Sequence, residues 1–351
     1  MPDVTLAELG GWPFVLGRLM RGEDLTSTQA AAALGEILDG NATDAQIAAF
    51  AVGLRIKGES VEEIAALVRT MVAYAEPVNA GDVVDTCGTG GDRSHSINVS
   101  TLAAFAVAGA GAKVCKHGNR AASSAAGSAD VLEALGVTID LDARGVERCI
   151  AEAGMGFCFA PKFHPASRHA VPARRELGVP TVFNFLGPLA NPGRPRRQLV
   201  GVSDPAMAEK VLGVLEANDV EHAMVVYGHD GLDELTTTTT STVLELLNGE
   251  VRTFVVDPAT LGLRTVDGEA LRGGDPATNA EIARRVLSGE AGPHRDVVVL
   301  NAAAGMVVAG LAAGLEEGVA RAQASIDEGK AAGVLDRLVA VSGAHRTSAE
   351  R

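Results

Sequence analysis

The clearest structural signal in the chain is carried by residues 82–92, which read Asp82-Val-Val-Asp-Thr-Cys-Gly-Thr-Gly-Gly-Asp92. A short β-branched run enters a glycine-rich turn here, and Asn98-Val-Ser-Thr101 then leads into an apolar helix that we expect to begin near Leu102. Glycines let backbone N–H groups close around an anion, and the start of a helix adds positive partial charge. Strand, turn and helix in this order predict an α/β domain with a phosphate-binding loop.

Two familiar phosphate motifs do not match this turn. A dinucleotide-binding GxGxxG that began at Gly88 would need glycine at the position of Arg93, and a Walker loop would need Gly-Lys at Arg93-Ser94. A tight turn without any ligand stays open as an alternative, because glycine-rich turns are common. We therefore treat the turn as a candidate phosphate site of another class.

Beyond this turn, short apolar or β-branched runs alternate with alanine-rich helical stretches from Pro77 onwards. The expected strands are residues 82–85, 112–115, 223–226 and 296–300. Such alternation predicts an α/β fold with a mostly parallel central sheet and ligand loops at the carboxyl ends of the strands. The uncharged run 297–315 approaches the length of a membrane span, but Asn301 and three glycines interrupt it. We interpret it as a strand, a turn and a buried helix.

Residues 1–76, in contrast, are expected to form a small helical bundle domain, with residues 77–351 as the larger α/β domain. Three capping boxes and two glycines mark helix starts and ends: Thr26 with Gln29, Thr43 with Gln46, Ser60 with Glu63, and then Gly40 and Gly58. Apolar residues between these signals recur at helical spacing. Each helix therefore has an apolar face that has to pack on a neighbour.

The composition narrows the classes of function. The 351 residues carry a formal net charge of -14 and are 47% hydrophobic, so the chain can bury a substantial core. Nucleic-acid binding and polybasic attachment to a membrane surface are disfavoured, because both depend on clustered lysine and arginine. The N-terminus lacks a signal-peptide pattern, and the four cysteines show neither a CxxC pair nor zinc spacing. We expect a cytoplasmic protein with reduced thiols.

A second candidate anion site follows the strand that ends near Cys115. Lys116-His-Gly-Asn-Arg-Ala-Ala-Ser-Ser124 and Gly127-Ser128 offer two cations, an imidazole, an amide and three serines, and Gly136 is expected to end the next helix. A solvated loop with ordinary helix caps is the alternative. Two anion loops so close in sequence suit a ligand that carries more than one phosphate.

A third segment, Gly231-Leu-Asp-Glu-Leu235, follows the strand that ends near Val226 and contains the adjacent acids Asp233 and Glu234. Magnesium is usually bound by one or two carboxylates together with water and substrate phosphates. Taken alone, a pair of adjacent acidic residues usually lies on the solvated surface and has no specific role. Its position beside two candidate phosphate loops makes it a candidate magnesium site.

The fourth segment, residues 162–175, is locally basic in an otherwise acidic chain. It contains Lys162, His164, Arg168, His169, Arg174 and Arg175. This density of positive charge suits a carboxylate or phosphate ligand, and arginine can bind a carboxylate with two parallel hydrogen bonds. A solvated charge run is the alternative. The chain has no Gly-x-Ser-x-Gly elbow and no His-Glu-x-x-His motif, so covalent serine chemistry and zinc hydrolysis lack their usual signatures.

Together these segments, in this order, resemble the anthranilate phosphoribosyltransferases. The matching stretches are Gly88 to Asp92, Asn98 to Thr101, Lys116 to Ser124, His164 to Pro192 and Gly231 to Glu234, and the similarity spans nearly the whole chain. The resemblance implies a homodimer, in which residues 164–180 return to the helical domain. It also implies transfer of phosphoribosyl from phosphoribosyl pyrophosphate to the amine of anthranilate, with release of pyrophosphate, the second step of tryptophan biosynthesis.

The resemblance further implies roles for individual residues. Phosphoribosyl pyrophosphate would be held by Gly88, Gly91, Asp92, Ser96, Asn98, Val99, Ser100, Thr101, Lys116, Ser124 and Ser128. Anthranilate would be bound by Gly88, His117, Asn119 and Arg174. Two magnesium ions (Mg2+) per subunit would be held by Ser100, Asp233 and Glu234, and the catalytic residues would be Asp233, Glu234 and Arg174. Ser167 departs from the larger side chain of some relatives, so the outer acceptor channel is expected to be wider here.

Two alternatives stay open at the level of the sequence. A pyrimidine nucleoside phosphorylase has a related fold and a similar Lys-His-Gly loop, but it would not need the acid pair and usually carries an additional C-terminal domain. A catalytically silent relative that binds nucleic acid is disfavoured by the net charge of -14.

Overall fold

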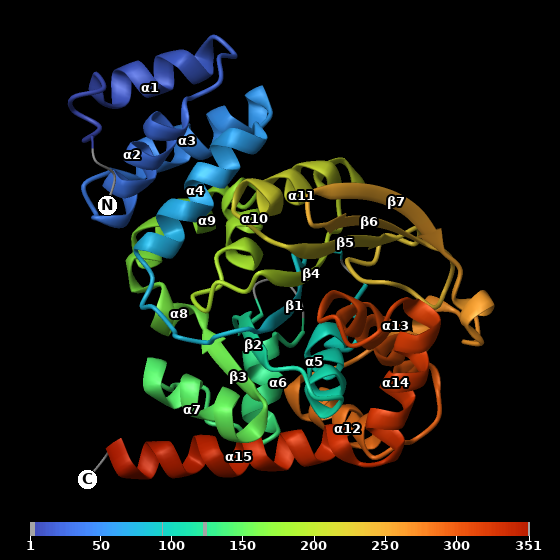
Figure 1. The fold of residues 1–351 in the computed structure, drawn as a ribbon. Coiled ribbons are helices and arrows are strands. Elements are labelled where there is room, and N and C mark those ends of the chain that lie inside the picture. Colours follow the sequence, from blue (N-terminus) through green and yellow to red (C-terminus); the bar gives the residue numbers. More distant parts are fainter. Residues whose placement is uncertain (1–3, 93, 122–124, 350–351) are drawn as a thin grey trace.

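The computed structural model describes residues 4–92, 94–121 and 125–349. Its first four helices form a bundle at one end of the molecule (Figure 1). These helices are α1 (Gly11–Met20), α2 (Ser27–Leu38), α3 (Asp44–Lys57) and α4 (Val61–Ala73). The three predicted capping boxes are all present and begin α2, α3 and α4, and Gly58 ends α3. The prediction of an N-terminal helical bundle is confirmed.

The rest of the chain is built around a seven-stranded sheet with the order β3-β2-β1-β4-β5-β6-β7. The strands are β1 (Val84–Gly88), β2 (Val114–Gly118), β3 (Met155–Phe159), β4 (Arg197–Gly201), β5 (His222–Gly228), β6 (Ser241–Leu247) and β7 (Glu250–Val256). The pairs from β3 through β5 are parallel, whereas β6 and β7 join antiparallel at one edge. The predicted mostly parallel sheet is therefore confirmed.

Both faces of the sheet are covered, and the strand sequences alternate between two cores. Leu199 and Met224 belong to one apolar cluster, while Val200 and Val225 belong to the other. The first cluster contains α5 (Val99–Gly109) and α13 (Pro293–Val308), which pack on each other. The second joins α11 (Ala208–Ala217) to the helical bundle. Strands buried on both faces explain why the predicted strands are nearly continuous apolar runs.

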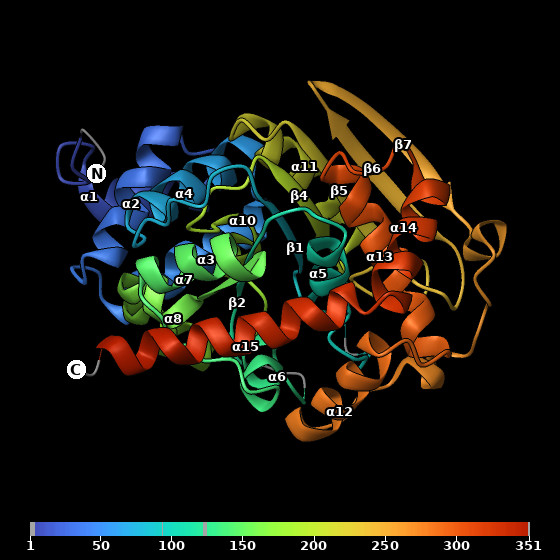
Figure 2. The same ribbon diagram turned by 60° about the horizontal axis from the view of Figure 1, so that its bottom comes forward.

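The remaining helices surround this sheet, and the turned view shows α15 running along one side (Figure 2). They are α6 (Ser128–Ala134), α7 (Ala143–Ala153), α8 (Ala160–Phe163), α9 (Val171–Leu177), α10 (Phe183–Leu189), α12 (Pro276–Leu287), α14 (Leu315–Asp327) and α15 (Lys330–Ala349). The short 3-10 turns are η1 (Pro165–Ala170), η2 (Pro205–Met207), η3 (Pro258–Leu261) and η4 (Gly268–Leu271). Within the described ranges, no helix has the length and hydropathy of a membrane span.

One predicted strand is wrong. Residues 296–300 do not form a strand but lie inside α13, whose first residue is Pro293. Every residue from Val297 to Val308 is buried, so this helix has no exposed polar face and no visible helical periodicity. Burial on all sides overrides the strand preference of its β-branched valines. Helix α5 also begins at Val99, three residues before the predicted start at Leu102.

The basic segment after β3 turns back towards the helical bundle. Turn η1 contacts α2, and α9 contacts α3. Ala170 and Ala173 belong to the same apolar cluster as the bundle helices. Turn η1 and helix α9 therefore lie beside the helical bundle (Figure 1).

Candidate active site

The candidate site begins where the order of the strands reverses. Strands β1 and β4 are neighbours although β2 and β3 lie between them in sequence, and Gly88 pairs with Gly201 at their carboxyl ends. At such a reversal, the loops that leave the two strands diverge and open a crevice for ligands. The predicted phosphate turn after Gly88 lies at this crevice.

The acid pair reaches the same place from the loop after β5. The Gly90 N–H donates to Asp233 Oδ2 at 2.6 Å, which joins the pair directly to the glycine turn. A Cβ atom at Gly88 would lie 2.3 Å from Asp233 Oδ2, and one at Gly201 would lie 1.6 Å from the Asp233 carbonyl oxygen. Both distances are too short for a side chain. The two glycines therefore make the space that Asp233 occupies.

Lys116 brings a buried positive charge to this crevice from β2. Its side chain is 2% exposed, and its ammonium group donates to the carbonyl oxygen of Thr86 at 2.5 Å and to Ser100 Oγ at 3.4 Å. Ser100 lies in the first turn of α5. A buried ammonium group needs anionic or polar partners. Lys116 thus joins strand β1 to the start of α5, and its charge acts on nearby Glu234.

Both acids are buried, and both have raised pKa values. Burial, followed by the charge of Asp92, raises the pKa of Asp233 to about 7. Burial, followed by the charge of Asp233, raises the pKa of Glu234 to about 8, although Lys116 and Ser100 oppose this shift. The three carboxylates therefore repel one another in a space with little water. Such a cluster favours a proton or a cation as a partner.

The donor set fits magnesium. Glu234 Oε2 is buried without a hydrogen-bond partner in the described part of the chain, so one carboxylate oxygen remains available to a cation. No group of three or more His, Cys, Asp or Glu side chains among the described residues is placed to hold a metal ion by itself. A divalent ion at the acid pair would complete its coordination with water and ligand phosphates, as magnesium commonly does.

The second predicted anion loop follows β2 and ends at α6. Ser128 Oγ donates to the Asn119 carbonyl oxygen at 3.4 Å, so the two ends of this loop are joined. Asn119 is exposed, and its own side-chain oxygen accepts from the Arg120 N–H at 2.8 Å. Arg120 itself is engaged by Asp130 and Glu133. Ser124, which was predicted to bind phosphoribosyl pyrophosphate, lies outside the described residues.

Asn98 connects the two anion loops with its side chain. Its amide nitrogen donates to the Ala126 carbonyl oxygen at 3.1 Å, and its amide oxygen accepts from Asn279 at 3.0 Å. Ser96 forms an isolated bridge with Arg272, which brings a further segment from the C-terminal part onto the β1 loop. Asp92 accepts from Ser94 Oγ at 2.6 Å. Protein contacts therefore already use the Asn98 amide, and Asn98 shapes the loops.

Two of the predicted acceptor residues, His117 and Arg174, each contact helix α10. His117 Nδ1 lies 3.0 Å from the Gly187 carbonyl oxygen, and its Nε2 has no partner among the described residues. Burial, followed by the neighbouring His164, lowers the pKa of His117 to about 3, so its ring is neutral. Its Nδ1 therefore donates to Gly187, and Nε2 is an acceptor. No contact in the described ranges joins Asn119 or Arg174 to the acid pair.

Arg174 lies on α9, above the ring of Phe183 at 5.6 Å. It is solvent exposed, yet the surrounding protein lowers the pKa of its guanidinium group through desolvation. No ion pair is formed by this group with a described residue, which leaves it available to a carboxylate ligand. Ser167, the predicted departure in the acceptor channel, lies with its hydroxyl 3.9 Å from the sulfur of Met71.

Sequence reasoning missed several residues that shape this site. Gly201 ends β4, a strand that was not predicted, and its pairing with Gly88 becomes visible only in the sheet. Ser203 donates to the Gly90 carbonyl oxygen at 3.0 Å from the same loop. Asn301 contacts the residue after the acid pair from α13. Asn301 was noticed only as an interruption of an apolar run.

Known protein families and relatives match this chain over nearly its whole length. Residues 14–75 match the glycosyl transferase family helical bundle domain, and residues 80–332 match the glycosyl transferase family a/b domain. An anthranilate phosphoribosyltransferase from Nocardioides sp. is 55% identical, covering 94% of this chain and 98% of the relative. One from Acidothermus cellulolyticus is 54% identical, covering 97% and 98%.

Solved structures show the same likeness. A crystal structure of anthranilate phosphoribosyltransferase from Thermus thermophilus has a TM-score of 0.89 and 42% identity, covering 94% of this chain and 99% of that chain. The enzyme from Saccharomyces cerevisiae, in complex with phosphoribosyl pyrophosphate and magnesium, has a TM-score of 0.88 and 27% identity, covering 95% and 98%. The identities, the two matched domains and the meeting of the glycine turn with the acid pair lead to one conclusion: this chain belongs to the anthranilate phosphoribosyltransferase family.

Proposed function

We propose that this protein transfers the phosphoribosyl group of phosphoribosyl pyrophosphate to the amine of anthranilate, releasing pyrophosphate in tryptophan biosynthesis. The observation that carries this proposal is the meeting of the acid pair Asp233 and Glu234 with the glycine turn and with buried Lys116. The glycine turn and the acid pair lie in the loops after β1 and β5, and Lys116 lies in strand β2. Each suits one part of a diphosphorylated sugar bound with a divalent cation.

The residues of the β1 loop, the start of α5 and the β2 loop would bind the phosphates. Gly91 and Asp92 follow the Gly90 N–H that anchors Asp233, and Val99, Ser100 and Thr101 form the first turn of α5. The positive end of a helix favours an anion there. The full set that we assign is the one implied by the family resemblance: Gly88, Gly91, Asp92, Ser96, Asn98, Val99, Ser100, Thr101, Lys116, Ser124 and Ser128.

We assign two magnesium ions per subunit to Ser100, Asp233 and Glu234. Magnesium bound there would neutralise the charge that develops on the departing pyrophosphate. Lys116 supports the same end of the ligand with a fixed positive charge, and the two glycines keep Asp233 close to the phosphate turn. Because anthranilate supplies an amine that is already nucleophilic, the protein needs no covalent nucleophile and acts mainly by positioning its ligands.

Anthranilate would occupy the side of the crevice formed by Gly88, His117, Asn119 and Arg174. The exposed guanidinium of Arg174 suits the anthranilate carboxylate, because a guanidinium group can donate two parallel hydrogen bonds. The neutral ring of His117 offers an acceptor nitrogen at Nε2 and places no positive charge beside the amine. The amine therefore stays free to attack the sugar carbon.

The experiment that tests this proposal follows the loss of anthranilate fluorescence when the purified protein is mixed with phosphoribosyl pyrophosphate and magnesium. We expect turnover that needs magnesium and that is abolished in Asp233→Asn combined with Glu234→Gln, while circular dichroism shows that the fold survives. Near-normal rates in the double variant at limiting magnesium would overturn the assignment of the metal site. Absence of any reaction in the wild-type protein would overturn the function itself.

We also propose a homodimer formed through the helical domain, residues 1–76 joined by residues 164–180, with residues 77–351 as the catalytic domain. Large apolar side chains are exposed on α1 and α3, which pack on each other: Phe14 (42% exposed), Met20 (87%) and Ile56 (82%). Exposed apolar side chains that gather in one region are typical of protein interfaces. A cytoplasmic location is consistent with the four cysteines, all of which are free and buried.

A further inference from the structure

We propose that Asn301 is a positioning residue for the acid pair, acting through the backbone of Leu235. This inference rests on the proposed function, because it concerns the magnesium site of that same reaction. Asn301 lies in α13 and is fully buried (0% exposed), within a helix whose neighbouring residues are apolar. It belongs to a different part of the chain from every residue that touches the substrates in our assignment.

The contacts of Asn301 are specific to one loop residue. Its Oδ1 accepts from the Leu235 N–H at 3.0 Å, and its Nδ2 donates to the Leu235 carbonyl oxygen at 2.8 Å. The same Nδ2 donates to the Val297 carbonyl oxygen of its own helix at 2.9 Å. The orientation of the amide follows from these partners, since Leu235 presents one donor and one acceptor. Asn301 therefore pairs with Leu235 as a neighbouring strand would.

A buried amide in an apolar helix is costly unless each of its polar atoms is bonded. A buried loop residue likewise needs partners for its own N–H and carbonyl groups. Asn301 and Leu235 meet both requirements at once, and Leu235 is itself fully buried. The pairing thus joins the loop after β5 to the rigid core between α13 and α5.

This anchor lies immediately after Glu234. On the other side of the pair, the Gly90 N–H bonds to Asp233. The acid pair is therefore fixed between two anchors, one at the phosphate turn and one at α13. Ser100 hydrogen-bonds to the Glu234 carboxylate, whereas Oε2 has no protein partner in the described residues, so the direction of Oε2 also depends on where the Glu234 backbone is held. Loss of the Leu235 pairing should consequently weaken magnesium binding more than it weakens anthranilate binding.

The test compares Asn301→Leu, which keeps a similar volume but removes all three hydrogen bonds, with Ser325→Ala. Ser325 is a matched control because it is also buried, and its hydroxyl donates to the Ala106 carbonyl oxygen far from the acid pair in sequence. We expect the magnesium concentration for half-maximal rate to rise about 10- to 100-fold in Asn301→Leu, as is usual when an outer partner of a metal ligand is lost. The KM for anthranilate should change much less, because the hydrogen bonds of Asn301 go to Leu235 and Val297.

A second measurement does not depend on turnover. Magnesium added with phosphoribosyl pyrophosphate should raise the unfolding temperature of wild type and of Ser325→Ala, and this rise should be much smaller in Asn301→Leu. Asn301→Asp provides a second variant of nearly unchanged shape, which keeps an acceptor for the Leu235 N–H but loses the donor to its carbonyl oxygen. It should raise the magnesium requirement as well, because an ionised carboxylate at this position faces the Leu235 and Val297 carbonyl oxygens without a donor.

The outcomes separate this inference from the proposed function. An unchanged magnesium requirement in both Asn301 variants, or an equal change in Ser325→Ala, overturns the positioning role while the function stands. If the wild-type protein shows no magnesium-dependent transfer, the proposed function fails and the inference fails with it.

Discussion

Because Gly88 has no side chain, Asp233 has room to lie against the phosphate turn. We expect Gly88→Ala to lower kcat/KM about 100-fold, because its Cβ would lie 2.3 Å from Asp233 Oδ2 and a misplacement near 1 Å has an effect of that order. Gly268→Ala is the control, since no atom lies within 4 Å of the added methyl group there. Steady-state kinetics measure both variants. Equal activity of the two would contradict the steric argument.

The raised pKa values of Asp233 and Glu234 predict how magnesium binding depends on pH. Magnesium binds the ionised carboxylates, so protons compete with it below the pKa values of about 7 and about 8. The magnesium concentration for half-maximal rate should therefore rise as the pH falls from about 8 to about 6. A requirement that stays constant over this range would show that the two acids are already ionised without the metal.

The same shifts predict a pH dependence of folding in the absence of metal. Folding raises both pKa values above those of the unfolded chain, so the stabilisation is complete below about pH 4 and is lost progressively as the pH rises from there through the folded values of about 7 and about 8. Asp233→Asn combined with Glu234→Gln should lack this loss. Urea unfolding of both proteins at pH 6 and pH 9 without magnesium makes the comparison.

Arg174 provides a test of the acceptor side. Arg174→Ala should raise the KM for anthranilate roughly tenfold or more, because a hydrogen-bonded charge contributes about 1.5–3 kcal/mol. The KM for phosphoribosyl pyrophosphate should change little. Arg175→Ala removes the adjacent exposed arginine and serves as the control. Equal effects on both substrates would count against a role in anthranilate binding.

At the residue level, the candidate site could be proposed from the sequence where its residues form a local pattern. The acid pair follows a strand, and the glycines follow another, so each was recognisable within a few residues of sequence. The hydrogen bond from Asn279 to the Asn98 amide oxygen could not be predicted, because the two residues are far apart in sequence and meet only in the folded chain. Asn301 was visible as a polar interruption, but its partner Leu235 lies in a distant loop.

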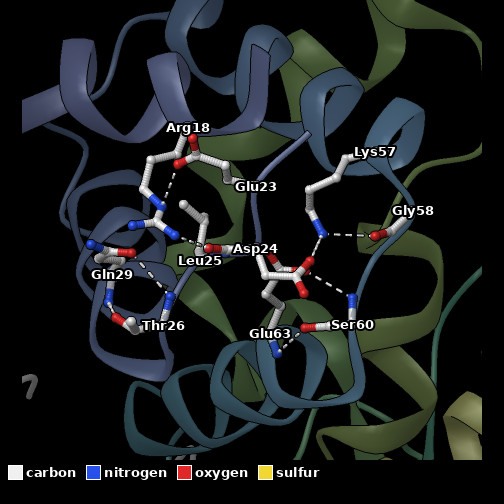
Figure 3. A network of polar contacts seen from close by, with 10 residues as sticks. All are labelled: Arg18, Glu23, Asp24, Leu25, Thr26, Gln29, Lys57, Gly58, Ser60 and Glu63. Carbon is white, nitrogen blue, oxygen red and sulfur yellow. Dashed lines mark hydrogen bonds and ion pairs between the residues drawn. The ribbon is translucent and has the colours of Figure 1, made fainter. Parts of the chain in front are cut away.

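Among the elements, the turn between α3 and α4 contains a buried ion pair in the helical bundle (Figure 3). Glu63 is fully buried and accepts from the Leu25 N–H, the Ser60 N–H and Lys57 Nζ, each at 2.8 Å. Lys57 also contacts the carboxylate of Asp24 at 2.5 Å. One carboxylate thus fixes the start of α4, the end of α3 and the entry to α2.

Loss of that carboxylate should destabilise the bundle. We expect Glu63→Gln to lower the free energy of unfolding by about 1.5–3 kcal/mol, because Lys57 would lose its buried counter-ion and keep only the exposed carboxylate of Asp24. The adjacent Glu62 bonds to Ser27 at the surface, so Glu62→Gln should change the same quantity by less than about 1 kcal/mol. Chemical denaturation followed by circular dichroism measures both. Similar values for the two variants would show that the buried pair contributes nothing beyond a surface contact.

Elements were predictable where their ends carry local chemistry. The capping boxes of α2, α3 and α4 involve residues three positions apart, so the start of each helix can be predicted from four residues. Helix α13 has no capping box, although Pro293 and Asp296 in its first turn are signals of a helix start. Its residues from Val297 onwards are all buried, so they show no amphipathic pattern, and the packing against α5 and α14 holds them as a helix.

For the whole molecule, alternation of strands and helices was sufficient to predict the architecture, whereas β3, β4, β6 and β7 were not predicted individually. The site depends on the adjacency of β1 and β4, which no local pattern contains. Membership in the anthranilate phosphoribosyltransferase family sets aside the nucleoside phosphorylase and nucleic-acid-binding alternatives.

Assembly of the whole molecule can be tested at the exposed apolar residues of the bundle. We expect wild type to sediment as a dimer of the 35.9 kDa chain and Ile56→Asp to sediment as a monomer, because a charge would have to be buried at the proposed interface. Val255→Asp on β7 is the control, since Val255 is also exposed but lies in the sheet. A monomeric wild type, or dissociation of both variants, would contradict the proposed interface.

The pairing of Gly88 with Gly201 also has a consequence for the order of events during synthesis. The two glycines are separated by roughly 110 residues, and ribosomes add about 5–20 residues per second. The first glycine turn therefore emerges several seconds before its strand partner exists. Closing so long a loop is entropically slow. Until β4 has been synthesised, the edge of β1 that will pair with β4 stays open. Chaperones can shield that edge during this interval.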